Sequence, residues 1–186
     1  IYGLGHAEEL LAKALKQTKT RPYIATKCGL LWNDKKEKVS CLKPDSIRQE
    51  CHDSLKRLGI ETIDLYQMHW PEPPEEIEQA WEQMVKLVDE GKVRYIGVSN
   101  FNLQQIQQLH TKRPVTSLQP PYSMLKREIE ANVLDFCKQN NIGVIVYSPM
   151  QRGLLTGKFN KTHLHSLPVD DHRKVHPDFQ EPNFSR

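Results

Sequence analysis

The sequence has no uninterrupted apolar run that approaches the ~20 residues a helix needs to cross a bilayer. It has little excess of either charge, because 26 lysines and arginines stand against 23 acidic residues and leave a net charge of +3. It has no CxxC pair, and the spacings of its 8 histidines match no zinc signature. We therefore predict a protein without a membrane span, a nucleic-acid footprint or a metal site.

The 4 cysteines do not suggest a disulfide framework in a chain of 186 residues, which indicates a reducing compartment. The first residues lack the charged segment followed by an apolar segment that marks a secretory signal. A cytoplasmic location is the expectation. With 38% hydrophobic residues the chain can build a core, so disorder is not expected.

Strand-like and helix-like segments alternate along the chain. After Pro44, for example, Ile47, Cys51 and Leu55 recur at helical spacing, and Gly59 ends the pattern. The same reasoning predicts helices over 7–17, 44–58, 75–92, 102–112 and 128–141, and strands over 22–29, 63–70, 94–100, 116–119 and 143–148. Such alternation is typical of βαβ units and a parallel sheet.

Two architectures compete for this pattern, an open doubly wound sheet and a closed barrel. The doubly wound fold would place a G-x-G-x-x-G motif after its first strand, but only Gly3-Leu4-Gly5 resembles it, and no strand precedes that turn. Successive predicted strand ends lie about 30 residues apart, the pitch of a ~250-residue eight-fold barrel. We predict an α/β fold, a (β/α)8 TIM barrel that is incomplete in this chain. Residues 1–186 would form one barrel domain, with 159–186 as a mobile loop.

Polar side chains stand where the predicted strands end. In a β/α barrel these ends open onto one face, where catalysis occurs. The residues at the five ends are Lys27, His69, Ser99 with Asn100, Gln119, and Tyr147 with Ser148. Each has a structural alternative: a lysine can snorkel to the rim, a histidine can be satisfied in the core, and the others can form turns or pack. Trp32 and Trp70 are candidates for the substrate mouth.

Several motifs in order resemble the aldo-keto reductase family, and the resemblance spans nearly all of residues 1–159. The motifs are Tyr2-Gly3, Ile24-Ala25-Thr26-Lys27, Met68-His69-Trp70-Pro71, Gly97-Val98-Ser99-Asn100-Phe101, Ser117-Leu118-Gln119, Tyr147-Ser148-Pro149-Met150 and the stretch from Gly153 to Lys158. The family's barrel also has a catalytic aspartate ahead of the tyrosine, two earlier strands and a last unit. The sequence does not contain these parts, so we expect a fragment.

The resemblance implies an NAD(P)-dependent oxidoreductase that reduces the carbonyl of an aldehyde or ketone, usually with NADPH, although NADH is possible. It implies that Tyr2 is the general acid, that Lys27 lowers the pKa of Tyr2, and that His69 positions the carbonyl oxygen. The implied cofactor-binding residues are Ser99, Asn100, Gln119, Tyr147, Ser148, Pro149, Met150, Arg152, Gly153, Leu154 and Lys158. The partner is a small carbonyl compound. Two alternatives stay open: a nicotinamide-binding regulatory or scaffold subunit, and a non-functional truncated product.

Overall fold

The computed structural model describes residues 2–185. The chain divides into two compact units, which we describe separately. The sheet unit comprises Ile1–Pro120 and Ile129–Ile145, and the loop unit comprises Pro121–Glu128 and Val146–Arg186. The assignment of the whole chain to one barrel domain stays a prediction.

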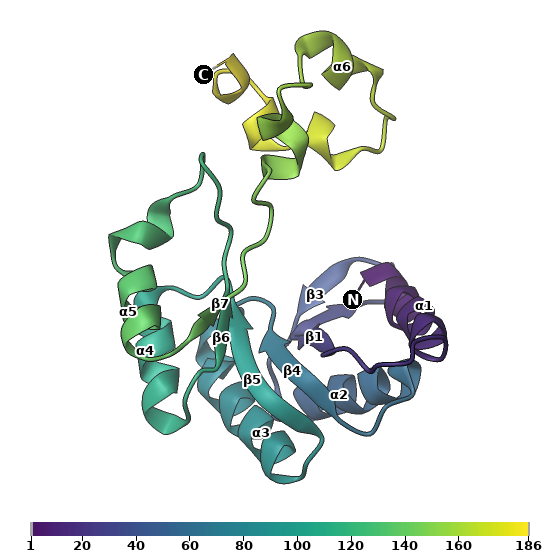
Figure 1. Ribbon diagram of the computed structural model, residues 1–186, viewed down its shortest axis with the longest axis vertical. Helices are drawn as coiled ribbons and strands as arrows, with labels where there is room; N and C mark the ends of the chain where they lie inside the picture. The colour runs from purple at the N-terminus through teal and green to yellow at the C-terminus, as the bar shows by residue number, and fades with distance from the viewer. Residues whose placement is uncertain (1, 186) are drawn as a thin grey trace. The chain divides into compact units, whose positions relative to one another are not determined.

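Five parallel strands form the sheet (Figure 1). In order across the sheet they are β1 (Ala25–Cys28), β4 (Ile63–Met68), β5 (Val93–Ser99), β6 (Ser117–Gln119) and β7 (Gly143–Val144). A small antiparallel hairpin, β2 (Leu30–Trp32) and β3 (Lys38–Ser40), follows β1. Because the sheet order follows the chain order, the sheet has no point where the order reverses, as a doubly wound fold would require.

Helices run along the outer side of the sheet in Figure 1; the first precedes β1, and each of the others leads into the next strand of the sheet. They are α1 (His6–Leu15), α2 (Pro44–Leu58), α3 (Ile77–Asp89), α4 (Leu103–Lys112) and α5 (Val133–Gln139). Short 3-10 turns are η1 (Tyr2–Gly5), η2 (Pro74–Glu76) and η3 (Glu128–Ala131). The glycines after α2 and α3 have left-handed backbones, with φ of 66° at Gly59 and 72° at Gly91. Gly59 thus ends α2 as predicted, and Gly91 follows the end of α3 in the same conformation.

The core lies between the helices and the strands. On α2 the predicted face is confirmed, because Ile47, Cys51, Leu55 and Leu58 are all buried. On α3 the buried stripe is centred on Trp81, and the complete side chains of Trp81 and Met84 are removed from solvent. Burial of one such side chain contributes about 2 kcal/mol to stability.

Two predicted elements differ from the observed ones. The predicted strand 143–148 is paired as a strand only over Gly143–Val144, because the neighbouring chain continues into Pro120 and Pro121, which have no N–H to donate. The predicted helix 128–141 is divided into η3 and α5 at Asn132, whose φ of −160° is extended.

The loop unit contains short helical turns: η4 (Gln151–Thr156), α6 (Lys161–Ser166), η5 (His172–Lys174), η6 (Pro177–Phe179) and η7 (Asn183–Ser185). Phe179 is the buried centre of this unit and lies 5.1 Å, between ring centroids, from Phe159. The mobility of 159–186 stays a prediction. Among the described residues, no helix combines the length and the apolar character that a membrane span demands.

Candidate active site

Lys27 lies near the carboxyl end of β1 and is half-buried. Burial lowers the pKa of its ammonium group. The Nζ atom lies 5.6 Å from the centroid of the Tyr2 ring, which is within the range of a cation–π contact. The structure therefore brings the first two predicted catalytic residues together.

Tyr2 begins the turn η1, in which Gly3 and Leu4 both have left-handed backbones. Its hydroxyl oxygen lies 3.3 Å from Nε2 of His69. Burial raises the pKa of the Tyr2 hydroxyl. The predicted lowering by Lys27 is thus wrong in this structure, because the effect of desolvation exceeds that of an ammonium group lying 5.6 Å from the ring centroid.

His69 directly follows β4, and its backbone N–H donates to the Cys28 carbonyl at 3.0 Å, which continues the pairing of β4 with β1. Burial, followed by the charges of Lys27 and Lys38, lowers the pKa of His69 to about 4. The imidazole is therefore neutral at pH 7. Its Nδ1 atom is buried and has no hydrogen-bond partner among residues 2–185.

Ser99, Asn100 and Gln119 lie at the ends of β5 and β6. The Ser99 hydroxyl donates to the Gln119 carbonyl at 2.7 Å. The Asn100 amide donates to the Ser99 hydroxyl at 3.1 Å and to the His69 carbonyl at 2.9 Å. Asn100 has a φ of 66°, a left-handed conformation that asparagine tolerates better than most residues. These contacts join the ends of three neighbouring strands, β4, β5 and β6.

A cavity of about 660 Å³ lies beside Tyr2 and His69. Both candidate mouth residues, Trp32 and Trp70, line it. The complete lining is Tyr2, Gly3, Leu30, Trp32, Lys38, Ser40, His69, Trp70 and Glu72. Its volume suits a small organic molecule.

The remaining predicted cofactor residues, from Tyr147 to Lys158, belong to the loop unit. Tyr147 forms a parallel bridge with Pro121. Left-handed backbones recur at Ser148, Arg152 and Gly153, with φ of 53°, 54° and 98°. At non-glycine residues such as Ser148 and Arg152 this conformation is strained, and strain of this kind is frequent in ligand-binding loops. Binding of a cofactor by these residues stays a prediction.

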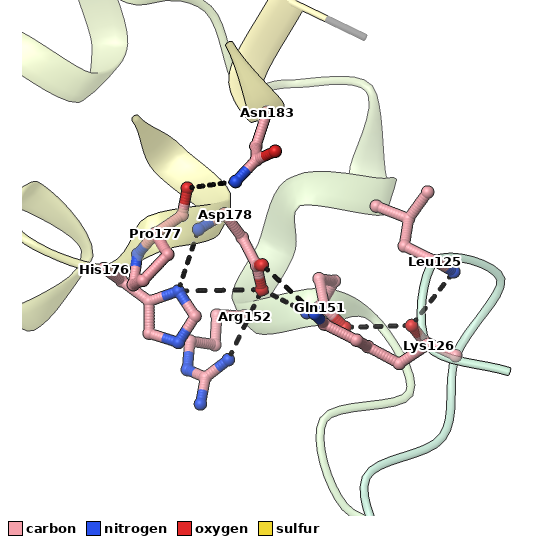
Figure 2. A network of polar contacts seen from close by, with 9 residues as sticks. Leu125, Lys126, Gln151, Arg152, His176, Pro177, Asp178 and Asn183 are labelled. Carbon is pink, nitrogen blue, oxygen red and sulfur yellow. Dashed lines mark hydrogen bonds and ion pairs between the residues drawn. The ribbon is translucent and has the colours of Figure 1, made fainter. Parts of the chain in front are cut away.

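Gln151 holds this loop in place (Figure 2). Its side chain is only 3% exposed, it accepts a hydrogen bond from the Ser123 hydroxyl at 2.8 Å, and it donates to the Asp178 carboxylate. The Asp178 carboxylate also lies 3.9 Å from Nη1 of Arg152 and 3.6 Å from Nζ of Lys126. Sequence reasoning missed Gln151 and Asp178, because 27 residues separate them and no local pattern links them.

Comparison with known proteins decides the family. The model of the aldo/keto reductase family matches residues 1–180. The chain belongs to the aldo-keto reductase family. This confirms the resemblance that the motifs indicated.

Among curated aldo-keto reductases, the chain is 41% identical over 185 residues to aldo-keto reductase YhdN of Bacillus subtilis, covering 98% of this chain and 55% of the relative. It is 36% identical over 190 residues to aldo-keto reductase yakc [NADP(+)] of Schizosaccharomyces pombe, covering 99% of this chain and 55% of the relative. The chain thus spans about half the length of the curated relatives it matches.

Solved aldo-keto reductases have a similar structure. The glycerol dehydrogenase AKR11B4 of Gluconobacter oxydans is 39% identical with a TM-score of 0.89, over 99% of this chain and 57% of that one. An aldo/keto reductase of Klebsiella pneumoniae in complex with NADP and acetate is 26% identical with a TM-score of 0.70, over 90% of this chain and 56% of that one. These matches confirm the predicted α/β fold, part of a β/α barrel.

Sequence reasoning also missed two acidic residues beside the Lys27 site of this aldo-keto reductase. Glu50, on α2, accepts from the Gly29 N–H at 3.0 Å and from the Ser46 hydroxyl at 3.1 Å. Glu8, on α1, accepts from the Thr26 hydroxyl at 2.7 Å and from Nε of Arg57 at 2.6 Å. The only sequence signal for Glu50 was its place next to Cys51 on the edge of an apolar helix face.

Proposed function

We propose that the protein transfers a hydride from NADPH to the carbonyl carbon of an aldehyde or ketone, and that the same site runs the reverse alcohol oxidation. The observation that carries the proposal is the 3.3 Å approach of the Tyr2 hydroxyl to Nε2 of His69, with Lys27 against the same tyrosine ring. The two aromatic side chains border a cavity of about 660 Å³ that suits a small carbonyl substrate. The names of the NADP(+) relative from Schizosaccharomyces pombe and of the Klebsiella pneumoniae complex support the choice of cofactor.

The strand ends fit the carboxamide of a nicotinamide. The Gln119 side-chain amide makes no hydrogen bond within the described part of the chain, so both its donor and its acceptor can serve a ligand. Ser99 and Asn100 supply further polar groups beside it. When bound, NADPH supplies the hydride; Ser99, Asn100 and Gln119 would fix which face of the ring is presented.

His69 would act as a neutral hydrogen-bond donor. Its Nδ1 atom is buried without a hydrogen-bond partner among residues 2–185 in either tautomer. We assign the proton to Nε2, because Nε2 lies 3.3 Å from the Tyr2 hydroxyl oxygen, which can accept it. The Nε2–H group then points to the Tyr2 hydroxyl and can donate to a carbonyl oxygen held beside it.

Tyr2 would donate the proton that the carbonyl oxygen needs as negative charge develops on it. Because burial raises its pKa, the phenol is protonated before the reaction at neutral pH. The phenolate left after transfer lies against the Lys27 ammonium, which favours the negative charge at that stage. In this arrangement Lys27 stabilises the Tyr2 phenolate that forms on proton transfer, and not the protonated Tyr2 hydroxyl that precedes it.

The test uses the protein expressed from its complete reading frame, with NADPH and a panel of aldehydes, and follows the absorbance of the reduced nicotinamide. We expect turnover in the wild type and a fall in kcat of about 10²–10⁴-fold in Tyr2→Phe, because the proton donor is lost. Tyr23→Phe is the matched control, since Tyr23 is 80% exposed and does not line the cavity. An unchanged kcat in Tyr2→Phe would contradict the role of Tyr2.

A further inference from the structure

The β2–β3 hairpin carries a lysine into the cavity beside Tyr2 and His69. In the hairpin register Lys38 is the cross-strand partner of Trp32, so the two side chains leave the hairpin on the same face. The Nζ atom of Lys38 lies 6.0 Å from the centroid of the Trp32 ring. Both residues line the cavity of about 660 Å³ that also contains the Tyr2 and His69 side chains.

Lys38 makes no ion pair in the part of the chain that the structure describes, because no carboxylate there lies within ion-pair distance of its ammonium group. The positive charge of Lys38 acts on His69 across the cavity, because Lys38 is one of the cations that lower the pKa of His69. An anionic group on a bound substrate would therefore find an available partner on the hairpin side of the cavity.

The other walls of the cavity are mainly aromatic. Trp70 stacks beside His69, with ring centroids 6.4 Å apart. On the hairpin side, the Trp32 ring lies against the Lys38 ammonium group. Flat apolar walls favour a flat or apolar substrate body, while the Tyr2 hydroxyl and His69 hold one polar end. Lys38 supplies the second polar contact.

We propose that Lys38 is a specificity-determining residue and that it makes the cavity select carbonyl compounds whose apolar or aromatic body also carries a carboxylate or a similar anionic group. The proposal rests on the proposed function, because the carbonyl end is assigned to Tyr2 and His69. It names the substrate class of that same site.

Glu72 supplies the opposing charge on the cavity lining. The Glu72 and Lys38 side chains are both exposed. Lys38 stands beside Trp32 on the hairpin, so an anion bound against that wall of the cavity pairs with Lys38, and Glu72 would weaken this selection. Neutralising the two residues should change the preference for an anionic substrate in opposite directions.

The experiment compares two aldehydes in the protein expressed from its complete reading frame. Para-carboxybenzaldehyde carries the anion, and its methyl ester is the uncharged counterpart. The readout is the ratio of their kcat/KM values. We expect Lys38→Met to lower this ratio about three- to fivefold, the scale of an exposed ion pair, and Glu72→Gln to raise it. Lys35→Met, in the exposed hairpin turn outside the cavity lining, is the matched control and should leave the ratio unchanged. An equal ratio in wild type and Lys38→Met would overturn the inference.

A binding measurement separates this inference from the proposed function. Calorimetric titration with para-(hydroxymethyl)benzoate, the alcohol that the anionic aldehyde would yield, measures recognition without turnover. We expect Lys38→Met to raise its Kd about three- to fivefold and Lys35→Met to leave it unchanged. If neither aldehyde is reduced, the proposed function fails, and the two Kd values still decide the inference. Equal Kd values in wild type and Lys38→Met would overturn it.

Discussion

The Gln67 side chain on β4 donates a hydrogen bond to the Ser117 hydroxyl on β6 at 3.0 Å, across the intervening strand β5. The contact passes over Gly97, which is the register partner of both residues. Gln67 and Ser117 are only 1% and 4% exposed, so each would leave a buried polar group unsatisfied without the other. A glycine at this position of β5 lets two polar side chains meet two residues before His69 and Gln119.

Gly97→Ala should therefore destabilise the protein strongly. A Cβ atom at this position would lie 2.6 Å from the Ser117 carbonyl oxygen and closer still to the Ser117 hydroxyl, so that backbone would have to shift. We expect the free energy of unfolding to fall by about 3 kcal/mol, as for severe overpacking. Urea denaturation measures the change.

Gly91→Ala is the matched control for this substitution. Its φ of 72° is left-handed, but apart from its chain neighbours no heavy atom lies within 4 Å of the position a Cβ would take. The expected loss is only about 1 kcal/mol, from backbone conformation alone. Similar losses for the two variants would show that close packing at Gly97 is not the cause.

Because of Glu50, we predict that the free energy of unfolding falls as the pH rises. Burial raises the pKa of Glu50 from 4.5 to about 7 in the folded protein. Between these pH values the folded state holds a proton that the unfolded state releases. The contribution of this proton to the free energy of unfolding is therefore fully present below about pH 4.5 and is lost as the pH rises through about 7. Glu50→Gln cannot titrate, so the variant should gain stability relative to wild type by up to about 3 kcal/mol across this window.

Denaturation of wild type and Glu50→Gln at several pH values tests the Glu50 prediction. Glu61→Gln is the control, because Glu61 is an exposed residue that follows the same helix. A difference between wild type and Glu50→Gln that stays constant with pH would show that Glu50 does not carry this proton.

Local patterns were enough to predict much of the fold. The spacing of Ile47, Cys51 and Leu55 identified the buried face of α2, because a helix repeats its surface every few residues. The regular spacing of polar strand ends predicted that Lys27 and His69 would stand at neighbouring strand ends, and β1 indeed pairs with β4.

Contacts between distant segments could not be predicted in the same way. The meeting of Gln67 with Ser117 depends on the register of three strands, which no local pattern encodes. The anchoring of Gly29 by Glu50 depends on how α2 packs against the turn after β1. The prediction for the pKa of Tyr2 had the wrong direction, because the sequence shows the charge of Lys27 but not how deeply the Tyr2 hydroxyl is buried.

His69 should stay neutral across the physiological range. Its pKa of about 4 lies below the ordinary 6.5, so the unfolded state binds its proton more readily, and stability is lost as the pH falls from about 6.5 to about 4. The imidazole NMR signals of His69 should therefore not titrate between about pH 5 and pH 8. Lys27→Met should raise the pKa of His69, because one of the charges that lower it is removed. A wild-type midpoint near 6.5 would contradict the prediction.

Asn100 should support catalysis by joining the end of β5 to His69. Its amide donates to the His69 carbonyl at 2.9 Å and to the Ser99 hydroxyl at 3.1 Å, so Asn100→Gly keeps the left-handed backbone accessible but loses both bonds. We expect a loss of about 2 kcal/mol in stability. We also expect a fall of about 10- to 100-fold in kcat/KM, because the His69 backbone and Ser99, which we propose to bind the nicotinamide, lose a shared anchor.

Asn102→Ala separates the effect on catalysis from the effect on stability. Asn102 caps α4, where its side chain accepts from the Gln105 N–H at 2.9 Å, and its loss should cost about 1 kcal/mol. Because the Asn102 side chain makes no hydrogen bond to the strand-end residues in the described part of the chain, kcat/KM should stay at the wild-type value. Parallel measurements of urea denaturation and aldehyde reduction on both variants provide the comparison. If Asn100→Gly lost stability but kept its kcat/KM, as expected for Asn102→Ala, Asn100 would be a structural residue and would not position His69.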